Sequence, residues 1–345
     1  MGKFVLNGVK ISVVRNILFL LLLPFVSFGQ LIVDTTAQNK KAILEEFTGI
    51  HCGYCPDGHV IAQQIKNIYP GDVFLINLHT GGYAMPGQGE PDFRIMESDS
   101  IAAISNLAGY PAGTVNRHQF PMTQGGGTAM GRGDWMDACI DIMSQPSYLN
   151  VGTQAIHDTV NETLIIDVEV YYTDSTPVDG FGFSPVNYLN IALTQDSVLG
   201  PQSGALTFNP NAIVPGPWQP TYVHQHMLRD MVTGQWGDPI INTPVGPGHF
   251  IFLRYIYEIP PYINDVMFKA EHIEVIAFVT EGTQGEIISG NACEVTYPAP
   301  PPVGWAEILP NGMHRDVTYD LYGRIVTKIK KNTIYIRNNE KFIKF

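Results

Sequence analysis

The chain carries two different patterns of hydrophobic and polar residues, and the change falls near residue 146. In the first part, short apolar runs alternate with segments whose apolar side chains recur every three or four positions. Residues 41–48 (KAILEEFT) and 72–79 (DVFLINLH) predict buried strands, and residues 57–70 between them predict a helix. A helix from near Asp92, a short strand in YPAGTVNRH and a helix in GDWMDACIDIMSQ continue the alternation. The first part is therefore expected to be an α/β domain.

The second part has the pattern of an all-β domain. The segment ETLIIDVEVYYTD places apolar side chains on one face and acidic side chains on the other, as a half-buried antiparallel strand does. Four later segments have the same character: NYLNIALTQ, GHFIFLRYIYE, EHIEVIAFVTE and EIISGNACEVTY. Several such strands without helices predict an immunoglobulin-like sandwich over residues 147–298, interrupted by a long loop at 199–247.

Both ends of the chain look like appendages to these domains. Residues 1–29 begin with basic residues, continue with the apolar run ILFLLLLPFVSF and end at small residues, which is the pattern of a cleavable signal peptide. The run is shorter than the ~20 residues of a membrane span. Residues 299–304 are a proline-rich linker, and residues 305–345 predict a small β tail. The sequence thus predicts two main domains, 38–146 and 147–298.

Composition and charge narrow the function. Hydrophobic residues make up 45% of the 345 residues, as expected of a globular protein, and the formal net charge of −12 argues against nucleic acid as a partner. Export would place the four cysteines where disulfides persist. Cys52, Cys55, Cys139 and Cys293 can pair in three ways. Cys52 with Cys55 is the local choice, and the spacing leaves open whether Cys139 meets Cys293.

The segment HCGYCPDGH, at the first strand-to-helix junction, carries the candidate chemistry. A cysteine in the first turn of a helix lies near unpaired backbone N–H groups, which lower a thiol pKa from ~8.5 to ~3.5–7.5. Cys52 is expected at such a position, ionised and accessible, as the attacking thiol. Cys55, one turn on, is expected to resolve the mixed disulfide. A protonated His51 would stabilise the thiolate further.

The alternation around this dithiol resembles the thioredoxin fold over residues 38–146. The resemblance implies that Glu46, six residues before the first cysteine, is a buried proton relay. It also implies that Pro111, in GYPAG, is a cis proline beside the dithiol and that Tyr110 and Pro111 hold the substrate backbone. Tyr54, between the cysteines, joins His51 and Tyr110 as an expected substrate contact. A histidine stands where tryptophan is usual, and the extra loop TGGYAMPGQGEP is expected to cover the site.

Each of these features has an alternative explanation. The two cysteines of the motif can form a static disulfide, Glu46 can be paired at a surface, and Pro111 can be trans in a plain turn. His51 and His59 flank the two cysteines, and YVHQHML offers His224 and His226, so zinc or copper binding is a further alternative. No cofactor is expected under the redox hypothesis, and no metal ligand is assigned.

Two longer resemblances concern the whole chain. The segments EEFTGIHCGYCPDGH, YPAGTVNR and HQHMLRDMVTGQWG resemble the outer-membrane protein 28-related family of the Gram-negative envelope, over roughly residues 38–298. The tail YDLYGRIVTKIKKNTIYIRNNEKFIKF resembles a type IX secretion sorting domain, although Thr333 stands where glycine is usual. These resemblances imply an exported protein of the outer membrane, cell surface or periplasm, with the outer membrane or secretion machinery as partner.

The sequence therefore favours thiol–disulfide exchange on envelope or secreted proteins. In this hypothesis the protein is an oxidoreductase or isomerase, and its partners are protein or peptide thiols and disulfides. The rival hypothesis is a surface binding or structural protein that uses a thioredoxin-like scaffold without catalysis. Copper binding is a third possibility. Accessibility of the Cys52 sulfur separates the first two, because a sealed sulfur cannot exchange.

Overall fold

The computed structural model describes residues 31–123, 125–178, 186–282 and 284–297, together with three short strands near the C-terminus. The predicted signal peptide and proline-rich linker lie outside the described residues. The chain divides into two units, Met1–Tyr297 and Pro298–Phe345, and each is described by itself. No helix in the described part of the chain is long and apolar enough to cross a membrane.

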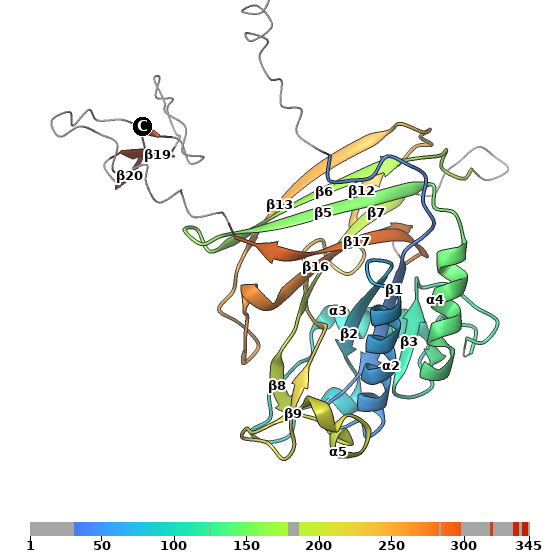
Figure 1. The fold of residues 1–345 in the computed structure, drawn as a ribbon, viewed down its shortest axis with the longest axis vertical. Coiled ribbons are helices and arrows are strands. Elements are labelled where there is room, and N and C mark those ends of the chain that lie inside the picture. Colours follow the sequence, from blue (N-terminus) through green and yellow to red (C-terminus); the bar gives the residue numbers. More distant parts are fainter. Residues whose placement is uncertain are drawn as a thin grey trace, which may run out of the picture. The chain divides into compact units, whose positions relative to one another are not determined.

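One large mixed sheet contains strands from both predicted domains (Figure 1). Its strands follow the order β13-β6-β5-β17-β16-β7-β11-β2-β1-β3-β4, and β12 pairs with β7. The bounds are β1 (Ala42–Thr48), β2 (Val73–His79), β3 (Ala112–Val115), β4 (Met130–Gly131), β5 (Leu149–Asp158), β6 (Thr163–Tyr172), β7 (Asn187–Gln195), β11 (Met227–Met231), β12 (Asp238–Ile241), β13 (Phe250–Glu258), β16 (Ile273–Glu281) and β17 (Ile287–Thr296).

Helices and short strands complete the fold. The helices are α2 (Cys55–Ile68), α3 (Met96–Ser105), α4 (Trp135–Ser144) and α5 (Ala205–Phe208), with single 3₁₀ turns at Gly82–Ala84, Arg132–Asp134, Pro210–Ala212 and Ala270–His272. The short strands β8 (Val198–Pro201), β9 (Ile213–Val214) and β10 (Thr221–His224) form one small sheet, and β14 (Tyr262–Ile263) pairs with β15 (Val266–Met267). In the C-terminal unit, β18 (Thr318–Tyr319), β19 (Ile334–Arg337) and β20 (Glu340–Ile343) form an antiparallel sheet, so the expected β tail is present.

The first region has the expected thioredoxin-like order. β1 is parallel to β2 and antiparallel to β3, and a helix follows each of these strands. The helices α2 and α4 cover one face of β1 and β2, around Leu44, Leu75 and Trp135 (Figure 1). The helix predicted from Asp92 begins instead at Met96, because the Asp92 carboxylate binds the backbone and guanidinium of Arg94 in an extended segment.

The second region is mostly β, but it is not a separate sandwich. β7 and β16 are buried on both faces. In β16, Val275, Ala277 and Val279 join a core with β5 and β6, whereas Ile276 and Phe278 join a core with β1, β2 and α3. β11 also hydrogen-bonds to β2, at Asn77. An isolated immunoglobulin-like sandwich over residues 147–298 is therefore wrong, because the two regions share a sheet and a core.

The loop predicted at 199–247 is also wrong. This stretch contains β8 to β12 and α5, so it has secondary structure over much of its length. Proline and glycine break it into pieces too short for a periodic sequence pattern. The helix α5 lies beside α2, which brings a segment of the second region to the dithiol helix (Figure 1).

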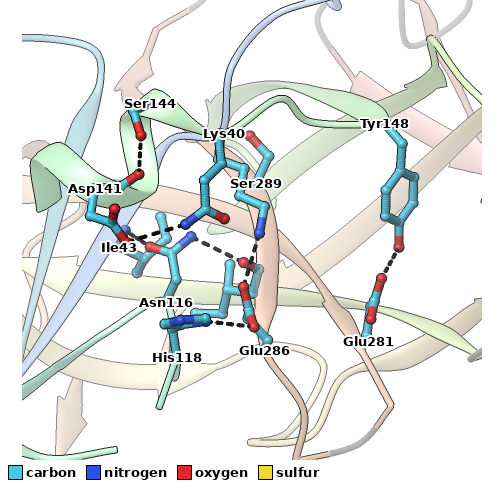
Figure 2. A network of polar contacts seen from close by, with 12 residues as sticks. Lys40, Ile43, Asn116, His118, Asp141, Ser144, Tyr148, Glu281, Glu286 and Ser289 are labelled. Atoms are coloured by element: carbon cyan, nitrogen blue, oxygen red, sulfur yellow. Dashed lines mark hydrogen bonds and ion pairs between the residues drawn. The ribbon is translucent and has the colours of Figure 1, made fainter. Parts of the chain in front are cut away.

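A buried network of polar side chains connects the two regions at the start of β1, the end of the strand away from the dithiol (Figure 2). The Asn116 side chain accepts a hydrogen bond from the Ile43 N–H (2.7 Å) and donates to the carbonyls of Lys41 (2.9 Å) and Ile287 (3.0 Å). Beside it, Glu286 accepts from Lys40 (2.9 Å) and pairs with His118 (2.8 Å). One asparagine thus connects β1 of the first region with β17 of the second.

We predict that Asn116→Ala lowers the free energy of unfolding by about 2–4 kcal/mol more than Asn106→Ala does, because it leaves buried backbone groups without partners. Both asparagines have positive φ (51° and 57°), so alanine brings a similar backbone cost at both sites. Asn106 is exposed, and its side chain donates only to Gly125. Urea unfolding measures the difference, and equal losses in the two variants would show that the network contributes little.

Candidate functional site

The two cysteines of the motif form a disulfide. The Cys52 and Cys55 sulfurs are bonded, with their Cα atoms 5.4 Å apart. Cys139 and Cys293 are free thiols, which answers the pairing question that the sequence leaves open. Burial raises the pKa of Cys139 to about 12 and that of Cys293 to about 11, so both are protonated and unreactive near neutral pH. Among the described cysteines, Cys52 and Cys55 are therefore the candidates for thiol–disulfide chemistry.

Cys52 lies in a turn before the helix, which corrects its expected position. α2 begins at Cys55, with Tyr54 as its N-cap residue and Pro56 in the first turn. Proline favours the first turn of a helix because its missing N–H is not needed there, and this fixes the helix start three residues after Cys52. The Cys52 N–H donates to the Gly49 carbonyl (3.0 Å). Cys52 thus approaches the helix end from outside rather than belonging to its first turn.

The disulfide is sealed, whereas an accessible sulfur was predicted. Cys52 is 2% exposed and Cys55 is 0% exposed. A segment that we call the cap, residues 201–208, contacts the turn that holds Cys52. The Gln202 side chain donates to the Gly49 carbonyl (3.2 Å) and the Cys52 carbonyl (3.0 Å). Gln202 is itself buried, so these bonds are shielded from water.

Backbone contacts fasten the cap on either side of Gln202. The Ser203 N–H donates to the Ile50 carbonyl (2.7 Å). Gly204 has φ +75° and approaches Gly53 so closely that a Cβ atom would lie 1.8 Å from the Gly53 carbonyl oxygen. No other residue fits there without moving the cap. At the cap's end, the Phe208 ring lies 5.3 Å from the Tyr54 ring.

Glu46 lies where the resemblance to thioredoxins predicts it. Its side chain is fully buried, and both carboxyl oxygens lack a hydrogen-bond partner among the described residues. Burial raises the pKa of Glu46 well above its usual value, and the more distant Arg132 opposes this only in part. The alternative explanation, that Glu46 forms an ion pair at the surface, is therefore wrong. The neighbouring Glu45 does form an ion pair, with Arg117 (2.6 and 2.9 Å), but this pair is buried on the other face of β1.

Pro111 lies beside this carboxyl group. The Tyr110–Pro111 peptide bond is cis, as the resemblance implies. Gly58, one turn after Cys55 in α2, packs between Pro111 and Glu46. A Cβ atom at Gly58 would lie 2.5 Å from the Glu46 Oε1 atom and 3.0 Å from the Pro111 Cβ atom. The strand β1, the helix α2 and the start of β3 therefore bring Glu46, Pro111 and the dithiol helix together.

The residues expected to contact substrate lie around the rim. Tyr54 is 59% exposed, and the Arg132 guanidinium lies over its ring at 5.8 Å. The His51 ring pairs with Glu90 (2.9 Å) in the loop that was expected to cover the site, and the His51 N–H donates to the Tyr83 carbonyl. Tyr110 packs against Tyr83. Because Glu90 pairs with the His51 ring, Glu90 would compete with a Cys52 thiolate for interaction with that ring.

Sequence analysis missed a buried histidine cluster behind the dithiol. The His224 ring lies 5.3 Å from His79, 4.9 Å from Tyr222 and 6.5 Å from His59. Burial lowers the pKa of His59 to about 4 and that of His79 to about 3, so both rings are neutral at pH 7. Among the described residues, no group of three or more His, Cys, Asp or Glu side chains is arranged to hold a metal ion. The only sequence signal was the His-x-His of YVHQHML, which had suggested a loop site.

A pocket of about 470 Å³ adjoins this cluster. His59, Tyr222 and Asn209 line it on one side, and Gln63 and Gln225 lie on the other. No Asp, Glu, Lys or Arg side chain lines the pocket. His59, one turn after Cys55 in α2, belongs to the pocket lining. The pocket gives His59 a connection to solvent that the disulfide lacks.

Comparisons with known proteins support the fold and leave the function open. No protein-family model and no curated protein matches the chain. The solved structure of HBP35 of Porphyromonas gingivalis is similar over 89% of this chain and 98% of that chain, with 16% identity and a TM-score of 0.52. An Agrobacterium tumefaciens protein matches over 74% and 94% (12% identity, TM-score 0.39). A domain of the outer membrane lipoprotein Omp28 from Porphyromonas gingivalis matches over 44% and 92% (15% identity, TM-score 0.26). At these identities the first similarity shows the fold alone.

Proposed function

We propose that this protein is an exported thiol–disulfide exchange protein whose dithiol reacts when the cap moves aside. The observation that carries the proposal is the buried, unpaired Glu46 carboxyl group beneath the helix of the Cys52–Cys55 disulfide, next to cis Pro111. A lone buried acid without a hydrogen bond costs folding free energy. Such a cost is typical of a functional site, and a proton acceptor for a buried thiol is a function that needs it.

The exchange step follows from the positions of the two sulfurs. A substrate thiolate attacks the Cys52 sulfur, which lies in the turn before the helix, and forms a mixed disulfide. The Cys52–Cys55 bond breaks, and the Cys55 sulfur leaves with the electron pair. Glu46, whose pKa burial raises well above its usual value, gives Cys55 its proton. The substrate thiol is thereby oxidised and the protein dithiol reduced, and the reverse sequence reduces a substrate disulfide.

Location and family belong to the same proposal. The predicted N-terminal signal peptide, the resemblance to the outer-membrane protein 28-related family and the sorting-like tail support an exported protein of the outer membrane, cell surface or periplasm. In that compartment disulfides persist, so protein or peptide thiols and disulfides are available as substrates. The exposed rim around Tyr54 would contact them.

A second candidate function is a binding or structural protein with a static disulfide. The burial of both cysteines under the cap favours it, because a sealed sulfur cannot be attacked. The two candidates differ in one property of the molecule, which is whether the cap opens. Three experiments address the reactivity of Cys52, the cap and the protonation of Glu46 separately.

We predict that Cys55→Ser accumulates mixed disulfides with exported proteins, because Cys52 can attack and nothing resolves the product. Cys52→Ser is the matched control and should trap none, since Cys55 lies deeper. Non-reducing gels of the protein expressed in a Gram-negative envelope, with and without dithiothreitol, measure the adducts. Absence of adducts in both variants would favour the static disulfide.

Opening of the cap should control the rate at which dithiothreitol reduces the Cys52–Cys55 disulfide. Gln202→Ala removes two shielded hydrogen bonds between the cap and the dithiol turn. At about 0.5–1.5 kcal/mol each, their loss should speed reduction roughly 5- to 100-fold. Gln64→Ala, on the exposed side of α2, is the matched control and should leave the rate unchanged. Equal rates in wild type and Gln202→Ala would mean that the cap does not limit access.

The protonation of Glu46 should appear as a pH dependence of stability. An acid whose pKa is raised by folding keeps its proton in the native state while the unfolded chain loses it, so it makes the protein less stable as pH rises through that interval. Glu46→Gln removes this cost. We expect the variant to gain thermal stability over wild type at pH 8 and little at pH 4. A gain of the same size at both values would show that Glu46 does not hold a raised pKa.

A further inference from the structure

We propose that His59 relays protons between Glu46 and the 470 Å³ pocket beside α2, with Tyr222 as the next member of the relay. The inference rests on the proposed function for its purpose, because a buried acid that exchanges protons with Cys55 must itself exchange them with solvent. The contacts from which the relay is inferred do not involve Cys52 or Cys55.

The dithiol side gives Glu46 no route to solvent. The cap seals Cys52, and Gly58 and Pro111 pack against the Glu46 carboxyl group. On the remaining side, His59 Nε2 lies 3.8 Å from Glu46 Oε1. His59 is one turn after Cys55 on α2, so the ring and the Cys55 side chain share a face of the helix. His59 is therefore the nearest group that can carry a proton away from Glu46.

The relay uses the His59 tautomer with its hydrogen on Nε2, which the hydrogen bonds around the ring accommodate. The Asn209 amide donates to the Tyr222 hydroxyl oxygen (2.8 Å), so the hydroxyl hydrogen is free to point at His59 Nδ1, 3.0 Å away. His59 Nδ1 then accepts, and the neutral ring carries its hydrogen on Nε2. That N–H points towards Thr48 Oγ1 (3.0 Å) and Glu46. In this tautomer the Nε2 hydrogen is donated to Thr48 Oγ1, and the buried Glu46 carboxyl oxygen lies 3.8 Å from the same nitrogen.

His59 and Tyr222 are both uncharged at rest, so each can pass a proton on without holding an extra one. His59 is neutral at pH 7 because burial and the nearby His226 lower its pKa to about 4. Burial raises the pKa of Tyr222, so its hydroxyl stays protonated. Arg132 acts on Glu46 from beyond the first turn of α2, and the neutral rings of His79 and His224 flank the path. No member of the relay holds a stable charge.

The proton balance is closed. When Cys55 leaves the disulfide as a thiolate, it takes the proton of Glu46. Glu46 then takes the Nε2 proton of His59, after the carboxyl group has moved closer by about 1 Å to hydrogen-bonding distance. His59 Nδ1 takes the Tyr222 hydroxyl proton, and water entering the pocket reprotonates Tyr222. The protein substrate thiol is the only reductant, and the reverse sequence carries one proton out.

The test measures the Glu46 proton directly. A protonated carboxylic acid gives an infrared carbonyl band. In the oxidised full-length protein at pH 7, the band that disappears in Glu46→Gln is assigned to Glu46. Rapid transfer into D₂O shifts this band as its proton exchanges. We expect His59→Gln and Tyr222→Phe to slow the shift about tenfold or more, since general acid–base groups contribute factors of that size. Glutamine keeps polar contacts with Thr48 and Tyr222 but cannot pass a proton between two nitrogens.

Two controls separate a relay from a structural role. His79→Gln replaces a more deeply buried ring of the same cluster that has no hydrogen bond to the relay, and it should exchange at the wild-type rate. Added imidazole should restore fast exchange to a His59→Gly variant. If His59→Gln does not fold, Tyr222→Phe carries the same prediction, because its ring still fills the site.

The outcomes decide the proposal whichever function is correct. Wild-type exchange rates in both His59→Gln and Tyr222→Phe, or equal slowing by His79→Gln, would overturn it. So would the absence of any band that Glu46→Gln removes, because Glu46 would then hold no proton to relay. The measurement uses the intact disulfide and needs no thiol chemistry. A static disulfide would therefore defeat the proposed function and leave the relay observable.

Discussion

The close approach of Gly204 to Gly53 is the constraint on which the chemistry of this molecule depends. It brings the cap onto the turn that holds Cys52, and Gln202 and Ser203 add hydrogen bonds on either side. Both cysteines of the disulfide are buried in this position. The same contact requires glycine at a positive φ, so it is a specific fit between two distant segments of the chain. In the proposed function, thiol–disulfide exchange at Cys52 requires that the contact between Gly204 and Gly53 first be broken.

The local features of the site were predictable because they depend on short stretches of sequence. Alternating strands and helices placed β1, α2, β2 and β3, and the resemblance to the thioredoxin fold placed Glu46 and Pro111. Strand periodicity also separates the two adjacent glutamates, since one faces α2 and the other faces the core with Phe278. Glu46 is thus the buried unpaired acid, and Glu45 is the partner of Arg117. These assignments follow from a period of two residues and from the family resemblance.

The features that sequence reasoning missed depend on contacts between distant segments. β16 is buried on both faces because one face meets β5 and β6 and the other meets β1 and β2, and its apolar run was mistaken for a strand of a free-standing sandwich. The cap comes from a stretch rich in proline and glycine, where periodic patterns are too short to predict anything. Cys52 was expected in the first turn of the helix, whereas α2 begins at Cys55, since Pro56 favours the first turn. His59 was considered as a metal ligand, whereas its partners, Tyr222 and Glu46, come from segments that only the fold brings together.

In the proposed function, a substrate reaches the Cys52 sulfur only after the cap moves, and the Glu46 proton reaches solvent through His59. In a dithiol at the protein surface, the substrate and the proton would reach the site from the same side. A dithiol under a cap reacts at a rate scaled by the fraction of molecules with the cap open, and an open fraction of about 1% slows every bimolecular step roughly a hundredfold. A partner that binds the open form recovers this loss in proportion to its preference for that form. The exposed Tyr54, whose ring contacts the tilted ring of Phe208 at the cap's end, is placed to couple partner binding to cap movement. Selectivity would then come from contacts with the cap, while the buried Glu46 and His59 keep the proton chemistry the same for every substrate.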